Sequence, residues 1–101
     1  MYYIVIMCEK PPLEWDNWNI EHIKKHAVTK EEVEEVYRTS TKLVQSYKKR
    51  KLILGKTKVG RLLTVVISYE KQINPYVVSA RDMSQKERRI YYEQTKTDKT
   101  V

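Results

Sequence analysis

Cysteine and histidine are scarce in this sequence of 101 residues. The single cysteine, Cys8, excludes a disulfide within the chain, which is typical of a reducing compartment and predicts a cytoplasmic protein. The two histidines, His22 and His26, lie four residues apart on one predicted helix face. No H-E-x-x-H motif accompanies them, and no clustered ligand spacing indicates a structural metal site. We therefore expect no metal and no cofactor.

Long hydrophobic runs are also missing. The longest, residues 2–7 and 62–67, fall far short of the roughly 20 residues that span a bilayer. No basic segment precedes the first run and no small-residue cleavage site follows it, so we expect neither a signal peptide nor a membrane partner. Hydrophobic content of 41% with 33% charged residues describes a globular chain. We expect one domain at residues 1–94 and a polar tail at 95–101.

Acidic side chains are absent from the middle third of the chain. Residues 36–69 contain nine lysines and arginines and no carboxylate, whereas residues 1–35 contain four basic and eight acidic side chains. With a net charge of +7, this distribution indicates a phosphate-binding surface. Alternatively, the segment is a hairpin whose turns are rich in solvated lysines. Charge alone does not separate RNA from DNA or from an acidic protein.

Two helices are predicted near the N-terminus. Ile20, Ile23 and Ala27 recur at helical spacing after Asp16, which can cap the helix. A second helix follows a capping box formed by Thr29 and Glu32. A closely connected helix pair is also typical of DNA-reading motifs, but the second helix here is acidic and would repel phosphate. We therefore exclude that function.

Strands follow the helix pair, and a third helix closes the chain. Apolar or alternating segments predict strands at residues 2–7, 43–47, 52–55, 61–67 and 76–80. Gly60 suits the turn between two of them. A second capping box, Ser84 with Glu87, begins a helix that we expect to end near Gln94. The fold class is therefore α+β: an antiparallel sheet of three to four strands, with two N-terminal helices and a C-terminal helix.

The residues best suited to chemistry are one histidine and a group of arginines. His26 ends the first helix, where it can be a cap favoured by the helix dipole or a general acid or base. Arg81, Arg88 and Arg89 surround the start of the last helix. Guanidinium groups can stabilise the phosphorane that forms when RNA is cleaved, and Tyr91 or Tyr92 could stack on bases. Alternatively, these arginines are solvated while the helix packs through its apolar residues.

Four blocks of the sequence, in order, resemble the BrnT toxin family. The family pattern is W-D, N and K-H-G-V before an acidic-apolar helix, then G-R-x-L-x-V-V, I-S-A-R and E-R-R…Y. The matching residues here are Trp15-Asp16, Asn19, Lys25-His26-Ala27-Val28, Gly60-Arg61-Leu62-Leu63-Thr64-Val65-Val66, Val78-Ser79-Ala80-Arg81, Glu87-Arg88-Arg89 and Tyr92. The resemblance spans residues 13–93. Ala27 stands where the family has glycine.

The resemblance implies a RelE-like fold and a function. Members are metal-independent endoribonuclease toxins, a class of hydrolase, of type II toxin–antitoxin systems. Each is neutralised by a small DNA-binding antitoxin of the ribbon–helix–helix type. By position, Lys25 and His26 match the K-H pair, Ser79 and Arg81 the S-A-R block, and the last block adds Glu87, Arg88 and Tyr92.

These observations lead to a hypothesis about each residue. Arg81 and Arg88 would stabilise the phosphorane, and His26 or Lys25 would transfer protons, with Glu87 as a second possible base. The predicted RNA-binding residues are Lys48, Lys49, Arg50, Lys51, Lys56, Lys58, Arg61, Ser79, Arg89 and Tyr92, mostly on one basic face of the sheet. Arg81→Ala is expected to abolish cleavage while changing the melting temperature little. The alternative is a non-catalytic module that binds nucleic acid or a protein partner through the same surface.

Overall fold

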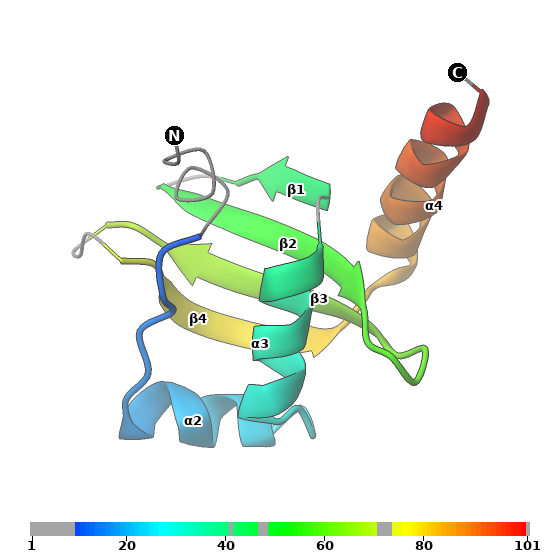
Figure 1. Ribbon diagram of the computed structural model, residues 1–101. Coiled ribbons are helices and arrows are strands. Elements are labelled where there is room, and N and C mark those ends of the chain that lie inside the picture. Colours follow the sequence, from blue (N-terminus) through cyan, green and yellow to red (C-terminus); the bar gives the residue numbers. More distant parts are fainter. Residues whose placement is uncertain (1–9, 41, 47–48, 71–73, 101) are drawn as a thin grey trace, which may run out of the picture.

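The structure, a computed structural model, describes residues 10–40, 42–46, 49–70 and 74–100 (Figure 1). Its elements are α2 (Asn17–Lys24), α3 (Lys30–Thr39), β1 (Lys42–Gln45), β2 (Arg50–Lys56), β3 (Leu62–Ser68), β4 (Tyr76–Asp82) and α4 (Gln85–Thr100). The predicted α+β layout, with two N-terminal helices, an antiparallel sheet and a C-terminal helix, is confirmed. The strand expected at residues 2–7 lies outside the described residues.

The four strands form a simple meander in the order β1-β2-β3-β4, with every neighbouring pair antiparallel. Successive side chains of a strand point to opposite faces, so the register sorts residues between the two sides. Leu54, Thr64 and Arg81 are partners on one face, while Val65 and Ala80 are partners on the other. The register shifts once between β3 and β4, at a β-bulge.

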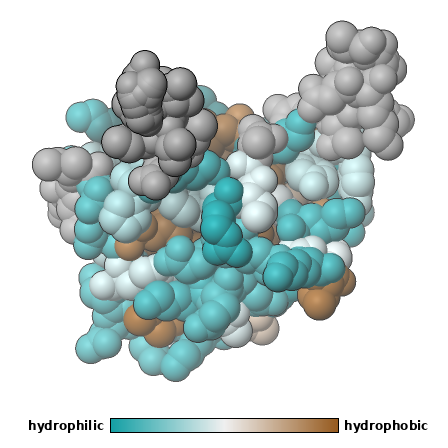
Figure 2. Space-filling model, in the orientation of Figure 1, coloured by the Kyte–Doolittle hydropathy of each residue, from teal (hydrophilic) through white to brown (hydrophobic). Residues whose placement is uncertain are grey.

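The hydrophobic core lies on the face of the sheet that α2 and α3 cover, with α3 lying across the strands in Figure 1. It contains Leu13, Ile23, Val28, Val33, Val36, Tyr37, Ile53, Leu63, Val65, Ile67, Val77 and Ala80. Gly55 allows the close approach of α3, since a Cβ there would lie 2.8 Å from a methyl group of Val36. Outside this core the helix-covered side is mostly hydrophilic, with small and separate apolar patches (Figure 2).

Both predicted N-terminal caps are confirmed by their hydrogen bonds. The side chain of Asp16 accepts from the Asn19 N–H at 3.0 Å, and the Asn19 side chain accepts from the Asp16 N–H at 2.9 Å. Thr29 and Glu32 make the same reciprocal pair at the start of α3. These local contacts satisfy N–H groups that a helix start otherwise leaves unpaired, and they fix where α2 and α3 begin.

The last helix differs from the expectation. α4 continues to Thr100 rather than ending near Gln94, so residues 95–100 extend the helix instead of forming a separate tail. No glycine or proline follows Ser84, and a polar composition is not by itself a stop signal. In Figure 1 this helix projects away from the end of β4. Among the described residues, no helix is long and apolar enough to cross a membrane.

Candidate functional site

A left-handed turn ends α2 and carries the predicted catalytic pair Lys25 and His26. Ala27 has φ of 58°, the conformation that favours glycine. The Val28 N–H donates to the Ile23 carbonyl at 3.1 Å, and the Ala27 N–H donates to the Lys24 carbonyl at 2.9 Å. This is the Schellman arrangement, with Val28 and Ile23 buried as its hydrophobic contact. The turn therefore presents the exposed His26 side chain from a defined backbone.

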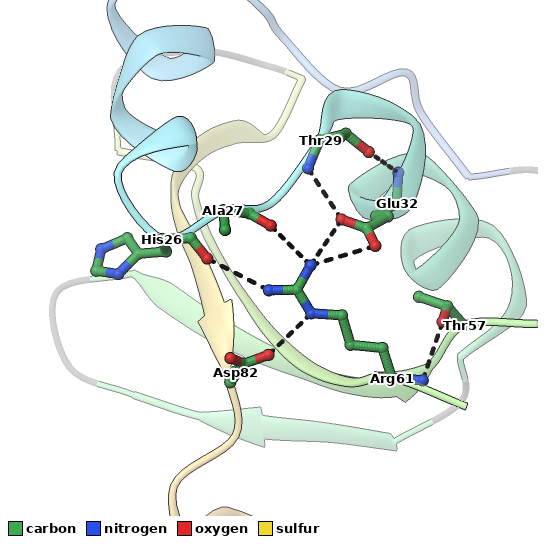
Figure 3. A network of polar contacts seen from close by, with 7 residues as sticks. All are labelled: His26, Ala27, Thr29, Glu32, Thr57, Arg61 and Asp82. Carbon is green, nitrogen blue, oxygen red and sulfur yellow. Dashed lines mark hydrogen bonds and ion pairs between the residues drawn. The ribbon is translucent and has the colours of Figure 1, made fainter. Parts of the chain in front are cut away.

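Arg61 holds this turn from outside the helix, as Figure 3 shows. Its Nη1 donates to the Ala27 carbonyl at 2.7 Å and to both carboxylate oxygens of Glu32 at 3.0 and 3.2 Å. Its Nη2 donates to the His26 carbonyl at 3.3 Å, and its Nε donates to Asp82 Oδ1 at 2.9 Å. One guanidinium thus joins the end of α2, the start of α3 and the end of β4.

These bonds change the interpretation of Arg61. The hydrogen bond that Arg61 donates to Asp82, and to a lesser extent those it donates to Glu32, raise the pKa of Arg61 above its usual value, against an opposing effect of burial. The side chain is 26% exposed, and all three of its nitrogens already donate within the protein. Arg61 was predicted to bind the RNA backbone, but its geometry is that of a residue that positions His26.

Arg81 makes a second and more local pair, with Glu87. Its Nη1 and Nη2 donate to the two carboxylate oxygens of Glu87 at 2.7 and 2.8 Å. Glu87 also accepts from the Thr64 hydroxyl at 2.8 Å and from the Ser84 N–H at 2.8 Å, which confirms the predicted capping box. Only 11% of the Glu87 side chain is exposed, against 37% for Arg81.

The electrostatics make Glu87 a weak base. The hydrogen bonds from Arg81 come first among the effects that lower the pKa of Glu87 to about 2, outweighing the opposite effect of burial. A carboxylate with so low a pKa holds a proton poorly at neutral pH. The arrangement therefore favours the structural role of Glu87 as cap and partner of Arg81 over a role in proton transfer.

The two arginine pairs lie on opposite faces of the sheet but meet at the same end of it. Arg81 and Asp82 are consecutive residues of β4, so their side chains point to opposite sides. Asp82 contacts Arg61 and, through it, the turn of His26, whereas Arg81 contacts Glu87 at the start of α4. The structure thus groups the predicted catalytic residues around one strand end, with Arg81 and Glu87 in direct contact on one face of the sheet and the His26 turn on the other.

The other predicted residues of the last block are more accessible. Arg88 and Arg89 are exposed on the first turns of α4, and Tyr92, one turn after Arg88, is 47% exposed. Ser79 is half-buried in β4 and pairs with Val66 on the face that carries Arg81. This leaves Arg88 and Arg89 as the exposed arginines closest in sequence to the Arg81 pair.

The predicted basic face divides into two. In β2, Arg50 pairs with Ser68 on one side of the sheet, while Lys51 pairs with Ile67 on the other and places its Nζ over the Tyr69 ring. Lys49, Lys56 and Lys58 are exposed in turns or at the end of β2, and Lys48 lies outside the described residues. The two-residue period of a strand separates cations that are adjacent in sequence, so the charge surrounds the sheet rather than covering one face.

Sequence reasoning missed the partners of the two arginines. Asp82 lies two residues beyond the strand that we predicted at residues 76–80, and Thr64 had no predicted role beyond its place in a strand. Glu32 was recognised only as a capping residue, although it also binds Arg61. Had the predicted strand been extended by two residues, the alternation of side chains along it would have placed Arg81 and Asp82 on opposite faces of the sheet. Nothing in the sequence indicates that Asp82 meets a residue 21 positions earlier.

Among the residues that the structure describes, no group of three or more histidine, cysteine, aspartate or glutamate side chains could hold a metal ion. Comparison of the chain with models of protein families, with curated proteins and with solved structures gives no match.

Proposed function

We propose that this protein is a metal-independent endoribonuclease of the type II toxin class. The observation that carries the proposal is the anchoring of the His26 turn, through Arg61, to the strand end that bears Arg81. An RNA strand crossing this end of the sheet would pass the exposed imidazole on one side and the cations of α4 on the other. Acid–base and cationic groups are what the reaction requires.

The reaction needs no external reactant. The 2′-oxygen forms a bond to phosphorus while the bond from phosphorus to the 5′-oxygen breaks, leaving a cyclic phosphate and a 5′-hydroxyl. One group accepts the proton of the 2′-hydroxyl and another donates a proton to the 5′-oxygen. His26 and Lys25 take these roles in the proposal, and Arg81 and Arg88 stabilise the phosphorane.

The conformation of Ala27 supports the resemblance behind this proposal. The family pattern has glycine after the histidine, and here that position has φ of 58°, where a Cβ is unfavourable. A glycine at this position therefore has a physical reason in this fold. The two polar pairs, Arg61 with Asp82 and Arg81 with Glu87, also fall on the arginines of the later blocks.

A second candidate function has its own observation. The charge of Arg81 is compensated by Glu87, and no acid and base among the described candidates contact each other. Both observations are compatible with a protein that binds RNA or an acidic partner without cleaving it. This alternative is a non-catalytic module that uses Arg88, Arg89 and the turn lysines as its contacts.

Purified protein incubated with a structured RNA in EDTA separates the two functions. Cleavage by the native protein is expected, with a loss of about 100-fold or more in His26→Ala and about tenfold in Arg88→Ala. Lys24→Ala and Lys86→Ala are matched controls, because each removes an exposed charge from the same helix outside the proposed site. Salt-dependent RNA binding without cleavage would select the binding module.

A cellular experiment tests the toxin class and its partner. Induced expression should arrest growth, His26→Ala should not, and co-expression of a small ribbon–helix–helix protein encoded beside this chain should restore growth. Normal growth on expression of a well-folded native protein would contradict the toxin assignment. The cytoplasmic location proposed from the single cysteine would place the enzyme with its RNA.

A further inference from the structure

A cleft lies where the N-terminal part of α2 meets β3 and β4. It has a volume of about 580 Å³, within the range of small-molecule sites. Its walls include Trp18 and Asp16 from the start of α2, Arg50 from β2, and Ser68, Glu70 and Tyr76 from the β3 and β4 ends. None of the residues proposed above for proton transfer belongs to it.

One wall of the cleft is an exposed aromatic ring. Trp18 is 57% exposed, an unusual state for the largest apolar side chain. Its ring stacks on His22 with centroids 4.7 Å apart and an interplanar angle of 9°. This stack holds the indole without burying it. Exposed aromatic rings that are fixed in position are the side chains on which proteins stack unpaired bases.

The other walls provide a cation and an anion. The buried Nε of Arg50 has no hydrogen-bond partner among the described residues, although a buried donor without a partner is costly. Glu70 is exposed, and its backbone N–H donates to the Ser68 hydroxyl at 3.1 Å. Asp16 is already engaged by the Tyr76 hydroxyl at 3.0 Å to both oxygens.

We infer that this cleft binds an unpaired guanine base of a single-stranded RNA, an inference that rests on the proposed ribonuclease function. Two carboxylates make the cleft unfavourable for a phosphate, whereas a neutral base stacks on Trp18 without a charge penalty. Guanine offers a pair of acceptors, O6 and N7, to Arg50 and a pair of N–H donors on its other edge to Glu70. The other bases do not present both pairs.

The cleft is placed to deliver RNA to the histidine turn. Trp18, His22 and His26 recur every four residues and so lie along one face of α2 and its C-terminal turn, with the His22 and His26 rings 5.9 Å apart. At 1.5 Å per residue, Trp18 and His26 are separated by about 12 Å along the axis. A base seated beside Trp18 therefore leaves its neighbouring phosphates within reach of the exposed imidazole.

The binding test uses oligouridine with a 2′-methoxy group on every ribose, because this RNA lacks the hydroxyl that attacks phosphorus. Fluorescence anisotropy compares the oligomer containing one guanosine with the same oligomer containing one adenosine and with plain oligouridine. We expect the guanosine oligomer to bind about tenfold more tightly than the others. Trp18→Ala should weaken its binding about tenfold, in the range for a base–aromatic stack. Arg50→Ala and Glu70→Gln should remove the preference for guanine.

Leu43→Ala and Arg38→Ala are the matched controls, because they remove an exposed apolar side chain and an exposed arginine that lie outside this cleft. Thermal unfolding of each variant checks that it folds. Equal binding of the three oligomers by the native protein, or unchanged binding by folded Trp18→Ala, would overturn the inference.

The inference and the proposed function fail separately. In one outcome, native protein and Trp18→Ala cleave unmodified RNA equally in EDTA, and the three oligomers bind equally. This outcome would support the proposed ribonuclease function and reject guanine binding in the cleft. In the other outcome, the protein prefers guanine in a way that depends on Trp18 but does not cleave unmodified RNA. This outcome would support guanine binding in the cleft and reject the ribonuclease function.

Discussion

The networks around Arg61 and Arg81 differ in the distance along the chain that each one connects. Arg61 reaches carbonyls and carboxylates 21 to 35 residues away and joins three elements. Arg81 pairs with a carboxylate only six residues ahead, across the turn between β4 and α4. Arg61 was predicted to bind the RNA backbone and Arg81 to stabilise the phosphorane. Their availability is nevertheless decided by carboxylates elsewhere, so a cation in a basic segment is not by itself a ligand-binding group.

The largest expected effect comes from Arg61. Arg61→Ala should lower the free energy of unfolding by about 3–4 kcal/mol, because it leaves Glu32, Asp82 and two carbonyls without their shared donor. Arg61→Lys should recover only part of this loss, since an ammonium cannot reproduce the planar set of donors. Urea unfolding measures both. Unchanged stability with weakened RNA binding would restore the RNA-contact role predicted from sequence.

The stability contributed by Glu87 should depend on pH. Its pKa is about 2 in the fold against a usual 4.5, so the folded state binds fewer protons between these values and gains stability as pH rises. The contribution, on the order of 3 kcal/mol, is complete above about pH 4.5 and lost as pH falls toward 2. Urea unfolding of native protein and Glu87→Gln from pH 7 to 2.5 should show their difference shrinking over this interval. A constant difference would contradict the assigned pair.

Arg81→Ala should cost about 2 kcal/mol, less than the loss at Arg61 because the Arg81 side chain is 37% exposed. This prediction differs from the expectation that the substitution changes the melting temperature little, because the substitution leaves the buried carboxylate of Glu87 without its cationic partner. Adding Glu87→Gln should recover part of the loss, and a double-mutant cycle measures the coupling. Additive costs would mean that the pair is not formed in solution. Any loss of cleavage in Arg81→Ala must therefore be compared with the cleavage by a control variant that is altered outside the site and destabilised by the same free energy.

The smallest expected effect is a gain, at the turn that Arg61 clamps. Ala27→Gly should stabilise the protein by about 0.5–1 kcal/mol, because glycine removes the strain that a Cβ causes at φ 58°. The greater freedom of glycine in the unfolded chain opposes this gain and keeps it small. Glu21→Gly, at an exposed position in the interior of α2, is the control and should cost about 1 kcal/mol. A loss in Ala27→Gly as large as in the control would show that the turn is not left-handed.

Local signals accounted for much of the fold. The caps at Asp16, Thr29 and Ser84 depend on atoms within three residues of one another, so they could be predicted from the sequence. The order of helices and strands followed from hydrophobic periodicity in the same way. The predicted end of α4 was wrong, because the chain there contains neither a residue that ends helices nor an apolar pattern.

The candidate site was less predictable than the fold. The sequence identified His26, Arg81 and Glu87 as residues of interest, and the structure brings two of them into direct contact. It did not indicate that Arg61 would hold the histidine turn. Nor did it single out Trp18, which shares a cleft with the predicted RNA-binding residue Arg50 about 30 positions later in the chain.

The sequence by itself determined the helix starts, the meander of strands and the basic middle segment, because each depends on neighbours along the chain. Only the tertiary structure decided which cations remain available. Strand alternation sent Arg50 and Lys51 to opposite faces, and carboxylates on α3, α4 and β4 engaged Arg61 and Arg81. Charge pairing depends on distance in space, and the folded sheet brings together groups that the sequence keeps far apart.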